Sequence, residues 1–132
     1  MSKELFWLTL TTAMTGLFWV PYILDRVASR GLMGAMGYPG PDDKPQAAWA
    51  VRQMKAHANA VENLVIFAPL VLIVHSLTLW SPTTLLACQA YFWARLVHYV
   101  VCTLGIPVVR TLAFFVGFLA QAALVLVIFR IL

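Results

Sequence analysis

The chain has 132 residues, of which 62% are hydrophobic and only 11% are charged. A mean hydropathy of +0.86 is typical of membrane proteins and excludes an ordinary soluble domain. The net charge is +4, but most of the basic residues gather in one connecting segment. We therefore interpret the positive charge as a signal of membrane topology, and we expect no nucleic-acid partner.

The first apolar segment, Leu5 to Leu24, has no charged residue over 20 positions, about the length that crosses a bilayer core. We expect it to be retained, because it is longer than the apolar region of a signal peptide and no small-x-small cleavage site follows it directly. Pro21 near its end predicts a kink, beside an aromatic belt that contains Trp19 and Tyr22.

The segment between the first and second spans carries most of the charge. Its basic residues outnumber its acidic ones: Arg26, Arg30, Lys44, Arg52 and Lys55 against Asp25, Asp42 and Asp43. The positive-inside rule then predicts that this loop is cytoplasmic and that both termini lie on the opposite side. Within it, Gly31 to Pro45 holds four glycines and three prolines and cannot be helical throughout. It is either a plain connector or a cap over a site.

The second helix is expected to begin near Gln46, with Asn63 to Trp80 as its membrane-spanning part. Polar side chains share one face of its first half at 100° per residue: Arg52, Lys55, Asn59 and Glu62, with Asn63 beside them and His57 on the opposite side. Ionisable groups at membrane depth are costly and usually face a protein interior or a water-filled cavity. This stripe is therefore either a set of polar contacts between helices or a ligand site.

The third and fourth spans are predicted at Pro82 to Leu104 and at Val108 to Ile131, separated by a break at Gly105-Ile106-Pro107. The third span carries a second polar stripe at positions i, i+3, i+4 and i+7: Arg95, His98, Tyr99 and Cys102.

An arginine as deep in a span as Arg95 needs a partner. Glu62 is interpreted as the one carboxylate in a membrane segment, so we expect an Arg95–Glu62 ion pair. The other cations near this end, Arg52, Lys55 and Arg110, would then have no buried acid. Their surplus positive charge favours an anionic ligand.

The two cysteines, Cys88 and Cys102, lie fourteen residues apart on one predicted helix and cannot pair with each other there. We interpret both as small apolar fillers. No histidine or cysteine pair has the close spacing of metal ligands, so no metal site is predicted.

The stretch from Lys55 to Glu62, KAHANAVE, followed by an apolar helix with Pro69, resembles the signature of the MAPEG family. These are the membrane-associated proteins of eicosanoid and glutathione metabolism. The resemblance continues with Arg95 and His98 late in the third span and with Arg110 early in the fourth. The resemblance covers the whole chain, and the chain is similar to the short bacterial-type members of the family.

The resemblance implies a four-helix protomer in a homotrimer, with a glutathione site near the cytoplasmic ends of the helices. The implied glutathione-binding residues are Arg52, Lys55, Asn59, Glu62, Arg95, His98 and Tyr99. Arg110 matches the family's arginine that stabilises the thiolate. A hydrophobic electrophile would enter from the lipid side. Three positions depart from the pattern: Lys55 stands where arginine is common, Cys102 where tyrosine is common, and Asn63 where an aromatic residue is frequent. The spacing to Arg110 is also offset by about one residue.

The sequence thus predicts a single domain, 1–132: an all-α integral membrane bundle of four transmembrane helices that assembles as a homotrimer. Its expected activity is that of a glutathione-dependent transferase or peroxidase on small hydrophobic electrophiles. The expected place is a bacterial inner membrane. Two alternatives stay open: a non-catalytic MAPEG-like binding or structural protein, and a small four-helix exporter, which would need an acidic residue in a span for proton coupling.

Overall fold

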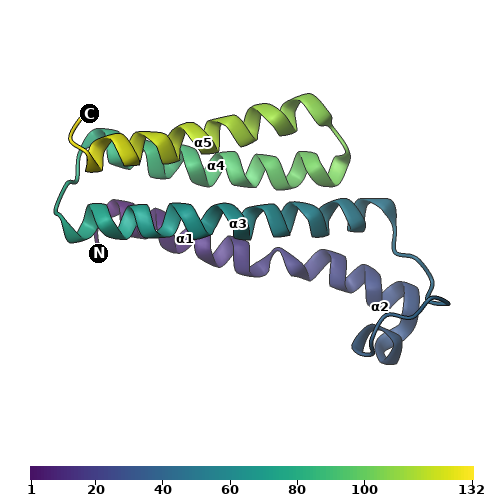
Figure 1. Cartoon of the computed structure of the whole chain (residues 1–132). Coiled ribbons are helices and arrows are strands. Elements are labelled where there is room, and N and C mark those ends of the chain that lie inside the picture. Colours follow the sequence, from purple (N-terminus) through teal and green to yellow (C-terminus); the bar gives the residue numbers. More distant parts are fainter.

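The computed structural model describes all residues, 1–132, and it is entirely helical. In chain order the helices are α1 (Lys3–Leu17), α2 (Trp19–Met36), α3 (Ala48–Ser76), α4 (Pro82–Leu104) and α5 (Pro107–Ile128). Because α1 and α2 follow each other almost in line, the helices form four units long and apolar enough to cross a membrane (Figure 1). The predicted all-α architecture is confirmed, with four helical units of the length and composition that a membrane span needs.

The first unit breaks at Phe18, three residues before Pro21. Proline has no backbone N–H to donate to the carbonyl of Leu17, and its ring crowds that carbonyl, so the helix opens there. Pro21 therefore interrupts the helix one turn before its own position, while α1 and α2 stay almost in line (Figure 1). A second break lies at Gly31, whose φ of 73° and ψ of 167° turn the end of α2 into a hook beside the bundle (Figure 1).

Helix α3 has 29 residues and is therefore roughly 43 Å long, more than the bilayer core requires. That its first turns lie outside the bilayer core stays a prediction. It ends at Ser76, a few residues before the predicted end of the span at Trp80.

Local signals set both ends of α4. Ser81 and Thr84 form a capping box at its start, with Pro82 in the first turn, and Gly105 ends it with a left-handed φ of 76°. The carboxylate of Glu4 on α1 accepts a hydrogen bond from the Thr84 hydroxyl at 2.9 Å, and Glu4 is buried. The prediction that Glu62 is the one carboxylate in a membrane segment is therefore wrong.

The apolar core lies in the half of the bundle that contains the termini. There Phe67 of α3 stacks on Tyr91 of α4 with ring centroids 3.8 Å apart, and Leu124 of α5 is fully buried beside them. The outward faces of the four units carry exposed large apolar side chains, as expected where lipid is the solvent. The residues that line the two polar cavities lie in the other half, toward the α4–α5 turn. Figure 1 shows this turn at the end of the bundle opposite the termini.

Candidate functional site

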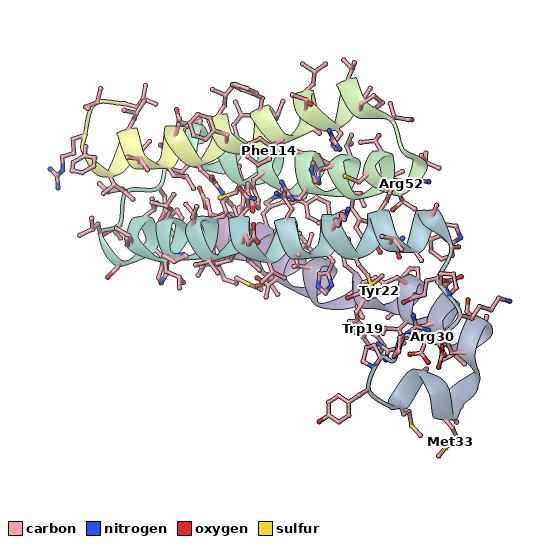
Figure 2. The ribbon with its side chains drawn as sticks, turned by 45° about the vertical axis from the view of Figure 1, so that its right-hand side comes forward. Trp19, Tyr22, Arg30, Met33, Arg52 and Phe114 are labelled. Carbon is pink, nitrogen blue, oxygen red and sulfur yellow. The ribbon has the colours of Figure 1, made fainter.

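Helices α3, α4 and α5 enclose an open pocket of about 320 Å³ in the polar half of the bundle. Each helix contributes lining residues: Lys55, Ala56 and Asn59 from α3, His98 and Cys102 from α4, and Arg110, Thr111 and Phe114 from α5. A smaller cavity of about 170 Å³ shares Lys55, Cys102 and Arg110 with it and adds Arg52 and the α4–α5 turn. Figure 2 shows Arg52 at this end of the bundle and Phe114 deeper along α5.

The charge of the site is positive. Lys55 and Arg110 line both cavities, and Arg52 lines the smaller one. None of the three is in an ion pair, because the one salt bridge of the structure joins Arg30 to Asp43 at 3.9 Å in the connecting segment. The surplus of positive charge that the sequence predicts is therefore present as a cluster of unneutralised cations on one concave surface.

Arg95 lies behind the pocket, with only 2% of its surface exposed. Its guanidinium donates to Asn59 Oδ1 at 2.6 Å and approaches His98 Nδ1 at 3.4 Å. The predicted Arg95–Glu62 ion pair is wrong, because Glu62 lies on an exposed part of α3. The amide of Asn59 supplies the acceptor oxygen without bringing a second charge out of solvent.

The contact between Arg95 and His98 determines how the histidine is protonated. A guanidinium has donors and no acceptor, so Nδ1 of His98 must accept and the ring proton of the neutral imidazole sits on Nε2. His98 is 5% exposed and lines the pocket, with Nε2 4.0 Å from Cys102 Sγ. A buried N–H donor therefore faces the pocket beside a thiol.

Arg52 is oriented by the end of α4. Its Nε and Nη2 atoms donate to the carbonyl of Thr103 at 3.1 and 2.9 Å. The carbonyls of the last helical turn lack partners in the helix and carry partial negative charge, so a guanidinium there completes the helix end. These bonds hold Arg52 at the mouth of the smaller cavity and fix the direction of its remaining donors.

Three predicted site residues line neither cavity: Arg95, which lies behind the pocket, Tyr99 and Glu62. Tyr99 points toward the first unit, where its ring stacks on Phe18 at 3.7 Å and its hydroxyl donates to the Phe18 carbonyl at 2.7 Å. Glu62 lies on an exposed part of α3. His57 also faces away from the pocket, as predicted, and shares a hydrogen bond of 2.8 Å with the Tyr22 hydroxyl.

Four lining residues of the larger pocket were not among the predicted site residues: Ala56, Cys102, Thr111 and Phe114. Cys88 is fully buried in the apolar core, as an apolar filler should be, whereas Cys102 lines both polar cavities. Its spacing of four residues from His98 and three from Tyr99 was visible in the sequence. Thr111 and Phe114 gave no comparable signal, because α5 is apolar along most of its length.

Comparison with known proteins identifies a family but no individual relative. No curated protein and no solved structure matches the chain. The family model described as "MAPEG family" matches residues 5–130, nearly the whole chain, and this family includes glutathione transferases and peroxidases among other proteins. The helical architecture with four membrane-length units agrees with that match. The chain belongs to the MAPEG family.

Proposed function

We propose that the polar pocket binds glutathione and that the protein is a membrane-bound glutathione-dependent transferase or peroxidase acting on small hydrophobic electrophiles. One observation carries the proposal: Lys55 from α3 and Arg110 from α5 line both cavities, Arg52 lines the smaller one, and none of them is neutralised by a carboxylate. Such a site selects an anion of small-molecule size, since pockets for such ligands start at about 300 Å³.

The residues present fit most of the groups of glutathione. Its two carboxylates can meet Arg52 and Lys55, and its thiol can lie toward Arg110. The fit is incomplete at the ammonium group, because no lining residue is acidic. Glu62, three residues beyond Asn59 on the same helix, is the acid we assign to that group. Because Glu62 is exposed on the single chain, this assignment fits a site completed between neighbouring protomers.

Arg110 is proposed as the catalytic residue. It lies in the first turn of α5, where its own charge adds to the partial positive charge of the helix N-terminus. A cation beside the sulfur stabilises the thiolate of the bound substrate. In a transferase reaction the thiolate sulfur forms a bond to the carbon of the electrophile, and the leaving group departs with its electron pair. The released anion remains next to the same cation.

The hydrophobic substrate has an apolar route to the site. A groove of about 330 Å³ between α4 and α5 is lined only by hydrophobic residues, among them Trp93, Val97 and Leu112. Phe114 of the same α5 lines the polar pocket. An electrophile dissolved in the lipid could reach the pocket along α5 without crossing water.

The proposal includes an assembly and an orientation. We assign the exposed apolar faces of the helices to lipid and to contacts in a homotrimer, with the segment between α2 and α3 on the cytoplasmic side of a bacterial inner membrane. The basic excess of that segment supports the orientation. Cross-linking in native membranes that yields species up to trimers, and none larger, would support the assembly.

The binding test is isothermal titration of the purified protein in detergent with glutathione, followed by turnover of an aryl halide. We expect millimolar or tighter binding, weakened in Lys55→Ala, and turnover that Arg110→Ala lowers by roughly 100-fold. Arg130→Ala is the matched control, because Arg130 is an exposed cation after the end of α5, at the opposite end of the bundle. No binding at millimolar glutathione would overturn the proposal, and binding without turnover would favour a non-catalytic role.

A further inference from the structure

We propose that Cys102 is a redox-active thiol of the polar pocket, which exchanges with glutathione disulfide and forms a mixed disulfide that closes the pocket to further substrate. The inference rests on the proposed function, because the cations assigned to glutathione would also hold the glutathionyl group. It adds to that function a covalent modification site and a control of activity by the thiol–disulfide balance.

The position of Cys102 separates it from a structural cysteine. It lies in the last turns of α4, lines both polar cavities and is partly exposed. Lys55 of α3 and Arg110 of α5 line the same two cavities. An anionic disulfide drawn to these cations is therefore held next to the Cys102 sulfur. Cys88, fourteen residues earlier on the same helix, has no exposed surface and no route to such a ligand.

His98 places an N–H donor beside the Cys102 sulfur. Its side chain is 5% exposed, and its Nδ1 accepts from Arg95. The remaining N–H, on Nε2, lies 4.0 Å from Cys102 Sγ, within hydrogen-bonding reach of the sulfur. The same N–H can donate to a sulfur of a mixed disulfide formed on Cys102.

The exchange needs no oxidant other than glutathione disulfide itself. The Cys102 thiolate attacks one sulfur of glutathione disulfide, a new sulfur–sulfur bond forms, and one glutathione leaves as thiolate with the electron pair of the broken bond. The proton of the Cys102 thiol goes to solvent before the attack. In the reverse step a glutathione thiolate attacks the mixed disulfide, which restores Cys102 and releases glutathione disulfide.

The modification has a direct consequence for activity. A glutathionyl group bound to Cys102 must occupy the space between Lys55 and Arg110, since that space borders the sulfur. A second glutathione cannot then bind. The enzyme is switched off when disulfide accumulates and is restored when glutathione is in excess.

The test is intact-mass spectrometry of the purified protein after incubation with glutathione disulfide. We expect one glutathionyl group on the wild type and on Cys88→Ser, and none on Cys102→Ser or Cys102→Ala. The rate is compared with that of a neutral disulfide, hydroxyethyl disulfide. Lys55→Ala should slow the reaction with glutathione disulfide roughly tenfold and leave the neutral reaction unchanged. Excess glutathione should remove the group.

The outcomes separate this inference from the proposed function. If Cys102→Ser binds glutathione in the titration and the wild type takes no glutathionyl group, the inference fails and the proposed function stands. If both disulfides react at equal rates, Cys102 is an ordinary accessible thiol and the inference fails. If the group forms selectively on Cys102 while no aryl halide is turned over, the inference stands and the transferase proposal fails.

Discussion

Replacement of Asn59 by alanine should destabilise the protein more than any other single change on the polar face of α3. Asn59 Oδ1 is the short acceptor for the guanidinium of Arg95, at 2.6 Å, and Arg95 is 2% exposed. The other neighbour, His98 Nδ1, lies at 3.4 Å and cannot replace a bond of that length. The alanine variant would leave a buried cation with one weak acceptor.

The magnitude follows from the charge of the donor. A hydrogen bond to a charged group contributes about 1.5–3 kcal/mol, and a buried charged group that loses its partner lies at the upper end of that range. We therefore expect Asn59→Ala to lower the free energy of unfolding by about 2–3 kcal/mol, or roughly 30- to 150-fold in the folding equilibrium. Asn59→Asp keeps an acceptor oxygen and should lose less than about 1 kcal/mol.

The assay is unfolding by denaturant in detergent micelles, followed by the loss of helical circular dichroism. Asn63→Ala is the matched control, because Asn63 donates mainly to the Asn59 carbonyl at 2.9 Å and does not contact Arg95. It should cost less than about 1 kcal/mol, as the loss of one neutral hydrogen bond does. Extrapolated free energies of unfolding are precise to about 0.5 kcal/mol. An Asn59→Ala variant whose free energy of unfolding equals that of the wild type within this precision would refute the reasoning.

Two further predictions concern the ends of α4. Glu4→Gln keeps an acceptor for the Thr84 hydroxyl but removes a negative charge beside the start of α4. We expect the free energy of unfolding, measured by thermal unfolding, to fall by about 0.5–2 kcal/mol. Glu4→Leu, which also removes the acceptor, should lower it further. Gly105→Ala places a Cβ 3.4 Å from the Arg52 guanidinium at a φ of 76°, and it should cost about 1–2 kcal/mol and weaken glutathione binding. Gly16→Ala, where a Cβ meets nothing within 4 Å, is the control: it should leave glutathione binding unchanged and raise stability by about 0.5–1 kcal/mol, because alanine favours a helix over glycine.

The helix bounds that the sequence predicted best are those set by local chemistry. Helix α4 begins at Pro82 and ends at Leu104 as predicted, because the Ser81 cap and Gly105 each act within a few residues. Pro107 likewise begins α5 in its first turn. The start of α3 was predicted within two residues, but its end was not, because no glycine or proline stands between Ser76 and Trp80.

The partners of the buried polar groups were not predictable in the same way. Arg95 could reach either Asn59 or Glu62, which lie three residues apart on α3, and the choice depends on how α3 and α4 are rotated against each other. The same limit explains why Tyr99 was assigned to the ligand and instead packs on Phe18. The spacing of side chains along one helix predicts which of them share a face, but it does not predict which residue of another helix contacts that face.

The cations at and behind the polar pocket are of two kinds, and the difference explains how a positive site is compatible with a stable fold. Arg95 is buried, so its guanidinium needs a hydrogen-bond acceptor inside the protein, and the neutral amide of Asn59 supplies one. Lys55 and Arg110 are exposed at the pocket, where water solvates them and their mutual repulsion is screened. No carboxylate of the chain is placed to neutralise these two. An acid at that place would stabilise the empty protein and compete with an anionic ligand, so its absence leaves the charge available for binding.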